Sequence, residues 1–354
     1  MRTLESAISN QKWIAVVEIR HLSIFCVLFS AICFLSSCFK EKPLIPPLKQ
    51  GEVQIGMIEM GPQYADQFFY SLEKNSVISQ NSRLAYDLMF DCNSSSFYIL
   101  LNTAKFMSVV HTGKTDLNSI TMGDASGKKW MYETGRYLPD SSALGEWWSA
   151  LGPEVTTKGE VYIINLGVDT LGDPLGYIKM KVNDFSASEY SITYSDMDNQ
   201  HLRTVSVSKD VRWNYRYFRF VNDSEIVDGI EPDKNLWDFC LTQYSYLFYD
   251  PYYLPYQVTG VLTNPSRTEV YMDSILNFDS IQFGDFNSSR LETRRDAIGF
   301  EWKRYGLNSS GTYSVNSNYT YYIRTGSTDY YKLRFNSFDR MGITGYPVFE
   351  YVRL

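Results

Sequence analysis

The sequence predicts an all-β protein with minor helix, organised as two tandem antiparallel β-sheet domains. Its last segment, 321–354, reads YYIRTGSTDYYKLRFNSFDRMGITGYPVFEYVRL. Apolar and polar residues alternate there in three short runs separated by glycines, as half-buried strands require. A looser copy, VYIINLGVDTLGDPLGYIKMKVNDFSASEYSITY, occupies residues 161–194. Past the N-terminal apolar segment, no helical periodicity extends beyond about two turns.

Composition supports a β protein and excludes several function classes. The chain has 354 residues, of which 28 are Tyr, 21 Phe and 7 Trp, and aromatic residues of this kind favour strands. The net charge of −7, without a basic cluster, argues against nucleic acid as a partner. The three histidines are too few and too scattered for a histidine-based structural zinc site.

The N-terminus resembles a bacterial lipoprotein signal. Residues 22–35, LSIFCVLFSAICFL, match a signal-peptide apolar region in length and are short for a membrane-spanning helix. The run ends in Leu-Ser-Ser-Cys, which resembles a lipobox and implies cleavage before Cys38 and diacylation of its thiol. Residues 1–37 are then a signal peptide and the proline-containing residues 38–49 an extended tether. The alternative is a buried apolar helix with an accidental cysteine.

The body of the chain reads as two copies of one pattern, residues 50–204 and 205–354. Each copy has an aromatic strand, an aspartate-containing strand, a strand that ends in asparagine, and a closing meander with a lysine. Because Asp87 and Asp238 recur inside a strand marker, we expect them to cap backbone amides rather than to catalyse. The corresponding positions are Asp87 and Asp238, Asn102 and Asn264, Tyr162-Ile163 and Tyr322-Ile323, and Lys179 and Lys332.

The two copies differ in two aromatic stretches that are candidate binding surfaces. The second copy carries TQYSYLFYDPYYLPYQ, with six tyrosines in sixteen residues, and aromatic loops of this kind are frequent in recognition surfaces. An internal cover over the sheet is the alternative. The first copy carries adjacent tryptophans that would clamp a flat ligand from a loop or pack in the core from a strand. The candidate residues are Trp147, Trp148, Tyr249, Tyr252 and Tyr253.

The aspartate marker, the Leu-Asn strand end and the closing set Tyr-Ile…Tyr-Lys-Leu-Arg-Phe…Gly-Tyr-x-x-Phe-x-Tyr behind a lipobox together resemble the HmuY family. These are haem-binding lipoproteins of Bacteroidetes. The resemblance is most specific over 236–354, is weaker over 50–204, and covers the body as two tandem HmuY-like domains. It implies a mostly β fold and a haemophore role, in which haem is captured without covalent attachment and passed to a TonB-dependent outer-membrane receptor.

The family holds haem iron between His or Met side chains in variable loops, so no ligand is carried over by motif. Thioether and imidazole are both ordinary haem ligands. Residues 205–354 contain no histidine, which excludes a bis-histidine site within the second copy. For each methionine, core packing is the competing interpretation; for the histidine it is an exposed polar position. The candidate ligands are His111, Met107, Met122, Met131 and Met272.

Catalytic motifs are missing from the sequence. It has no Gly-x-Ser-x-Gly, no phosphate-binding glycine loop and no His-Glu-x-x-His, which argues against an enzyme. We therefore expect an outer-membrane lipoprotein, on the periplasmic or cell-surface face, that binds haem. The alternative is a surface lipoprotein of the same fold that binds glycan or protein without haem.

Overall fold

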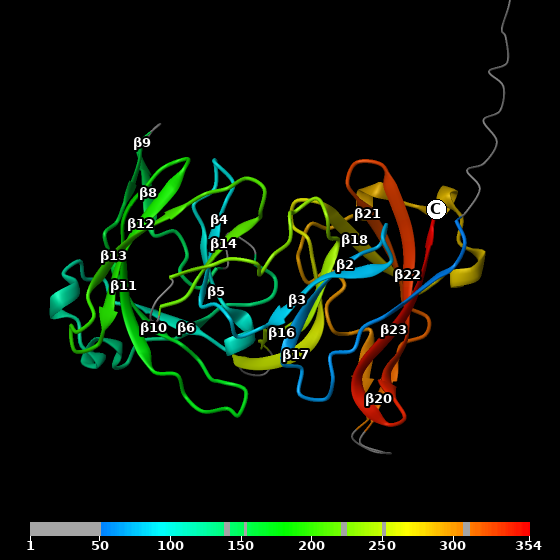
Figure 1. The fold of residues 1–354 in the computed structure, drawn as a ribbon, viewed down its shortest axis with the longest axis horizontal. Coiled ribbons are helices and arrows are strands. Elements are labelled where there is room, and N and C mark those ends of the chain that lie inside the picture. Colours follow the sequence, from blue (N-terminus) through cyan, green and yellow to red (C-terminus); the bar gives the residue numbers. More distant parts are fainter. Residues whose placement is uncertain (1–50, 138–141, 152–153, 221–224, 250–252, 307–311) are drawn as a thin grey trace, which may run out of the picture. The chain divides into compact units, whose positions relative to one another are not determined.

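The computed structural model describes residues 51–137, 142–151, 154–220, 225–249, 253–306 and 312–354. Over these residues the protein is all-β, with antiparallel sheets and short 3-10 turns, which confirms the predicted fold class (Figure 1). The expected signal peptide, Cys38 and the expected tether lie outside the described residues. None of the helical segments that are described has the length and apolar character needed to cross a membrane.

A first β-sandwich consists of a six-stranded and a four-stranded sheet. In spatial order, the larger sheet contains β13 (Arg203–Ser208), β12 (Glu189–Asp196), β11 (Tyr177–Phe185), β10 (Val161–Asn165), β6 (Ser108–His111) and β7 (Met131–Tyr132). The smaller contains β15 (Ile226–Val227), β14 (Tyr215–Phe218), β4 (Leu88–Asp91) and β5 (Ile99–Leu101). Buried side chains from both sheets form one core between them, for example Phe90 from β4 and Met180 from β11.

A second β-sandwich repeats this plan. Its larger sheet contains β1 (Gln54–Met57), β23 (Ile343–Arg353), β22 (Asp329–Arg340), β21 (Thr320–Thr325) and β18 (Thr268–Asp273). Its smaller sheet contains β17 (Leu254–Thr263), β16 (Phe239–Phe248), β2 (Asp66–Ser71) and β3 (Ser76–Ser82). Phe239 from β16 and Leu333 from β22 meet in its core.

Short elements complete the two sandwiches. Two small hairpins are formed by β8 (Trp148–Leu151) with β9 (Glu154–Thr157) and by β19 (Lys303–Tyr305) with β20 (Tyr313–Val315). The 3-10 turns are η1 (Thr103–Lys105), η2 (Leu117–Ser119), η3 (Met122–Ala125), η5 (Phe278–Ser280), η6 (Phe283–Asp285) and η7 (Ser288–Arg290).

Alternation in the closing meander directs side chains to opposite faces of the second sandwich. Tyr331, Leu333 and Phe335 enter the core, because successive strand residues point to opposite sides. Between them, Lys332 points to the other face, where its Nζ donates to the carbonyls of Phe278 and Ile281 at 2.7 and 2.9 Å. Burial lowers the pKa of the Lys332 amine.

Lys179 has the same role in the first sandwich, where its Nζ donates to the carbonyl of Ile120 at 3.1 Å. The predicted correspondence of Lys179 with Lys332 is therefore confirmed. The predicted match of Tyr162-Ile163 with Tyr322-Ile323 is wrong by one residue. Ile163 lies opposite Lys179, whereas Tyr322 lies opposite Lys332, so Ile163 corresponds to Tyr322.

The first three strands of each sequence copy are exchanged between the sandwiches. β14 pairs with β4 of the first copy, and β2 pairs with β16 of the second. Likewise β13 pairs with β12, and β1 pairs with β23. In Figure 1 the cyan and blue β2 and β3 thus belong to the same sheet as the yellow β16 and β17. Strands β1–β3 complete the second sandwich, and β13–β15 complete the first.

This exchange corrects the expected domain organisation. The boundary between 50–204 and 205–354 separates two sequence copies, but it does not separate two sets of hydrogen-bonded strands. Lys49–Leu354 form one compact unit. Residues 84–235 contain the whole first sandwich, whereas the second is built from residues on both sides of that range.

The recurring aspartates fasten the exchanged strands. Asp87 Oδ2 accepts from the Phe220 amide, just after β14, at 2.8 Å. Asp238 Oδ2 accepts from the Leu72 amide, just after β2, at 2.7 Å. In each case the other carboxylate oxygen accepts from a cation, Lys105 for Asp87 and Arg267 for Asp238. The expectation that these aspartates cap backbone amides is confirmed.

Candidate functional site

His111 ends β6 and is held by its own sandwich. Its Nε2 lies 3.0 Å from the carbonyl oxygen of Ala143, and its ring packs edge-on against Tyr162 at 5.1 Å. The side chain is 40% exposed, which agrees with the alternative interpretation of an exposed polar histidine. At the corresponding position of the second sandwich stands Met272, because Tyr162 lies opposite His111 and Tyr321 lies opposite Met272.

The predicted methionine ligands are dispersed. Met107 is fully buried in the core of the first sandwich, which agrees with the competing interpretation of core packing. Met122 is exposed on η3. Met131 and Met272 each line a different cavity, the second of about 230 Å³.

Met131 lies in a cavity where the two sequence copies meet, which we call the tyrosine pocket. One wall comes from β7 and its flanks, the other from the hairpin of β16 and β17, and the cavity has a volume of about 450 Å³. Small-molecule sites in proteins have volumes of roughly 300–1,000 Å³. The lining residues are Lys129, Met131, Tyr132, Thr134, Arg136, Tyr246, Leu247, Tyr249 and Tyr253.

A glycine lets the hairpin approach this wall. The Gly135 amide donates to the Ser245 carbonyl at 3.0 Å. A Cβ at Gly135 would lie 2.4 Å from the Tyr244 ring, so any larger residue would push the hairpin away. The residues next to Gly135 in the sequence do not predict this long-range contact.

The tyrosine-rich insert divides into a covering part and an exposed part. Tyr244 and Leu247 are buried, in agreement with the alternative interpretation of an internal cover. Towards the hairpin tip, exposed fractions reach 69% for Tyr249 and 57% for Tyr256, as a recognition surface requires. Tyr252 lies outside the described residues.

Cations and tyrosine rings set the chemistry of the tyrosine pocket. Lys129 Nζ lies 4.0 Å from the centroid of the Tyr253 ring, and the Tyr249 and Tyr253 rings are 5.9 Å apart. Burial raises the pKa of Tyr253, although the nearby Tyr132 backbone opposes the shift, so its phenol stays protonated. Arg136 Nε is 3.6 Å from Asp296 Oδ2, and its side chain remains 45% exposed. Sequence reasoning missed Lys129, Tyr132 and Arg136, whereas Tyr246 lies in the tyrosine-rich stretch that it singled out.

The two tryptophans pack rather than clamp. Trp147 is buried in the core of the first sandwich, and its Nε1 donates to the Phe97 carbonyl at 3.1 Å. Trp148 starts β8 and packs edge-on against Tyr98 at 4.9 Å. The burial of Trp147 agrees with the alternative interpretation of core packing. Trp148 is half-buried beside it.

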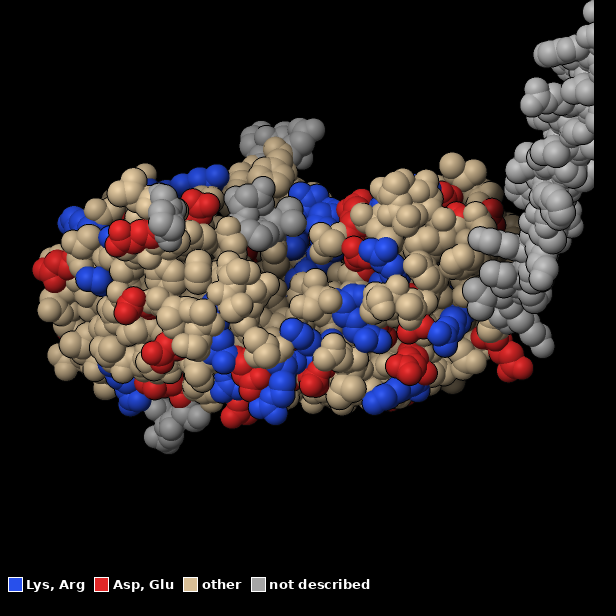
Figure 2. All heavy atoms as spheres, turned by 90° about the horizontal axis from the view of Figure 1, so that it is seen from above, with Lys and Arg blue, Asp and Glu red and all other residues tan. Residues whose placement is uncertain are grey.

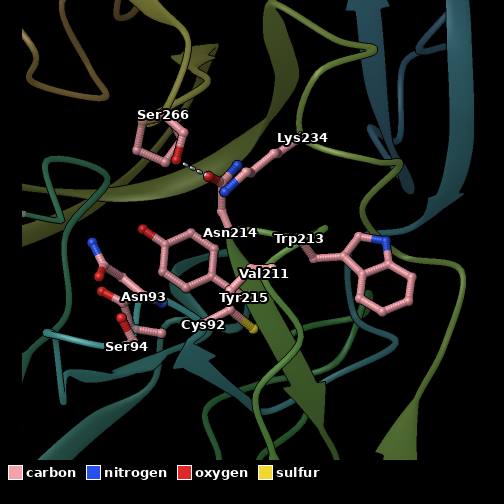
Figure 3. Close-up of a pocket in the computed structure, with 11 residues that line it drawn as sticks. Cys92, Asn93, Ser94, Val211, Trp213, Asn214, Tyr215, Lys234 and Ser266 are labelled. Carbon is pink, nitrogen blue, oxygen red and sulfur yellow. Dashed lines mark hydrogen bonds between the residues drawn. The ribbon is translucent and has the colours of Figure 1, made fainter. Parts of the chain in front are cut away.

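A second cavity, of about 360 Å³, is lined mainly by polar residues (Figure 3). Buried Asn214 lies in its wall, accepts a hydrogen bond from Ser266 Oγ and donates to Glu231. Burial raises the pKa of Glu231 to about 7. Lys234 and Asn93 contribute further polar groups. The character of this lining suits a small polar ligand better than a flat apolar one.

Charge does not mark out one part of the face seen in Figure 2. On the side seen in Figure 2, basic and acidic side chains are interspersed. Among the residues that the structure describes, no group of three or more His, Cys, Asp or Glu could hold a metal ion. Cys92 and Cys240 are both buried and free.

One comparison with known proteins identifies the family. The model of the family described as HmuY protein matches residues 63–351. This range runs from just before β2 almost to the end of β23 and takes in both sandwiches except β1. No curated protein matches the chain. The match covers well over half of the chain, and HmuY proteins are binding and uptake proteins typical of the cell surface. The chain therefore belongs to the HmuY family.

Proposed function

We propose that this protein is a lipid-anchored haem-binding protein that captures haem in the tyrosine pocket for uptake through a TonB-dependent outer-membrane receptor. Family membership supports a haem-related role. The observation that supports the proposal most directly is that residues predicted for two separate reasons line the same cavity. Met131, a candidate ligand, and Tyr249 and Tyr253, candidate binding-surface residues, all line it.

The residues of the pocket fit haem. Four tyrosines provide flat apolar faces, and aromatic rings favour stacked or edge-on partners. Two cations, Lys129 and Arg136, stand at the same cavity and match the two carboxylates that haem carries. Met131 supplies a thioether, an ordinary haem ligand. Capture is thus a binding function, and no step of it requires a catalytic residue.

A haemin titration tests the proposal. The soluble fragment that begins after Pro47 is titrated with haemin and followed in the Soret and visible region, where saturable binding with a shifted Soret band is expected. Tyr249→Ala should weaken binding, because this exposed ring lines the pocket. Tyr305→Ala is the matched control, since Tyr305 is also exposed and is not among the lining residues. His111→Ala should leave binding unchanged. A flat titration in both oxidation states would reject the haem function.

Anchoring is tested separately. Diacylation of Cys38 should add the mass of a lipid anchor to the mature protein, and Cys38→Ala should release the protein from the membrane fraction. Two acyl chains anchor durably, whereas one is marginal. An unmodified Cys38 in membrane-purified protein would contradict the lipoprotein assignment.

A second candidate function is supported by the polar cavity of Figure 3. Its amide, hydroxyl and amine groups suit a saccharide, so a surface lipoprotein that binds glycan without haem is the alternative. Asn93→Ala and Lys234→Ala would then reduce glycan binding in a titration in which haemin gives no signal.

A further inference from the structure

We propose that the tyrosine pocket recognises the flat ring and the carboxylates of a tetrapyrrole rather than its iron, so that it binds metal-free porphyrin as well as haem. This inference rests on the proposed function and deepens it, because it names the ligand class as planar dianionic tetrapyrroles.

Iron ligands are weak in this pocket. Neither His111 nor His201, the two histidines that the structure describes, is among its lining residues. Met131 is its single sulfur-containing lining residue, and that side chain packs against the core of the first sandwich, so turning its sulfur towards a ligand would give up core contacts. Tyr253 keeps its proton because burial raises its pKa, whereas a tyrosine that ligates iron does so best as the phenolate.

Ring contacts come from both walls of the pocket. Tyr132 stands on the β7 wall, while Tyr246, Tyr249 and Tyr253 stand on the hairpin wall. A flat ring between these walls meets aromatic faces and edges from two elements, whatever atom occupies its centre. Stacking of this kind depends on the ring system, which haem and metal-free porphyrin share.

Charge recognition is available at the same place. Lys129 contacts the Tyr253 ring and has no carboxylate partner among the described residues. Arg136 makes one long ion pair, 3.6 Å to Asp296, and Asp296 also contacts Arg294. Both pocket cations can therefore turn to a ligand carboxylate. Such charge-assisted contacts are among the stronger hydrogen bonds, and they too are independent of iron.

The test compares three probes on the same soluble protein. These are haemin, metal-free protoporphyrin IX and its dimethyl ester, followed by quenching of protein fluorescence and by porphyrin emission. We expect haemin and protoporphyrin IX to bind with dissociation constants within about tenfold of each other, and the ester to bind at least about tenfold more weakly. Lys129→Met with Arg136→Met should weaken haemin and protoporphyrin IX equally, and Met131→Leu should change neither by more than about threefold.

The outcomes separate this inference from the proposed function. Binding of haemin with no binding of protoporphyrin IX, together with loss of haemin binding in Met131→Leu, would overturn the inference and leave haem capture standing. Binding of protoporphyrin IX without binding of haemin would overturn the inference, which requires both ligands to bind, and would reject haem capture. Failure of both probes would overturn both proposals. Circular dichroism of each variant shows that a loss of binding is not a loss of fold.

Discussion

Two fragments of similar length, 50–204 and 84–235, should differ in whether they fold in solution. Fragment 50–204 is one sequence copy, and fragment 84–235 contains every strand of the first sandwich. We expect 84–235 to fold and 50–204 to remain unfolded or aggregated. The reason is that 50–204 carries β1–β3 without their partners β16 and β23, and lacks β13–β15.

The missing strands remove a large share of the free energy of folding. Val207, Phe218 and Phe220 belong to the buried core of the first sandwich. Burying an apolar side chain of this size contributes about 1.5–3 kcal/mol, so the three together contribute roughly 5–9 kcal/mol. Domains are stable by only about 5–15 kcal/mol. Loss of β14 also leaves the backbone of β4 without the partner that Phe218 and its neighbours provide.

Urea unfolding followed by near-ultraviolet circular dichroism and tryptophan fluorescence measures this difference. Fragment 84–235 should show a cooperative transition. Its apolar face that packs against Tyr244, Val258 and Leu262 in the full protein becomes exposed, so the measurement is made on dilute protein to avoid aggregation. Fragment 50–204 should show no transition, and adding 205–354 should restore one. A cooperative transition in 50–204 alone, with none in 84–235, would refute the strand exchange.

Three single substitutions test other features of the fold. Asp87→Asn should destabilise the protein by about 3–5 kcal/mol in urea unfolding, because it leaves buried Lys105 without its counter-charge. The control Asp228→Asn, at an exposed carboxylate, should cost less than about 1 kcal/mol. Equal effects of the two substitutions would contradict the buried-pair argument. Gly167→Ala should lower the free energy of unfolding by more than about 1 kcal/mol, because φ at Gly167 is 77° and the new Cβ would lie 1.9 Å from the Lys105 carbonyl oxygen. An unchanged urea midpoint would argue against this backbone conformation. Burial raises the pKa of Glu231 from 4.5 to about 7. The folded state therefore binds more protons than the unfolded state between these pH values, and the free energy of unfolding should fall as the pH rises from 4.5 to 7. Glu231→Gln should flatten this part of the pH profile, and an unchanged slope would exclude Glu231 as its source.

Much of the fold could be predicted because it is encoded locally. Alternation in the closing meander directs Tyr331 and Leu333 into a core and Lys332 away from it, and the structure has this arrangement. The aspartate markers could be interpreted as amide caps, because their recurrence in a strand context needs no knowledge of tertiary contacts. The one-residue error at Ile163 arose because both Tyr-Ile pairs fit an alternating pattern, while register is set by partners across the sheet.

The candidate site was predictable only in part. Met131 and Tyr249 were singled out for separate reasons, yet they line one cavity, because a hairpin of the second copy packs on β7 of the first. Met107 and Trp147 carry the right chemistry but are core residues, and composition alone does not distinguish a buried thioether or indole from an accessible one. Lys129 and Arg136 carried no local signal, since exposed cations occur throughout the sequence and nothing beside these two marks a binding site.

The sequence by itself determined the all-β class, the two copies, and the aspartate and lysine positions that stabilise each sandwich. Only the tertiary structure decided which copy each strand joins. The physical reason is that the copies are similar, so the local pattern permits either β2 or β14 as a partner of β4 and of β16. In the structure β14 pairs with β4 and β2 pairs with β16, and residues of β7 and of the β16–β17 hairpin line the tyrosine pocket.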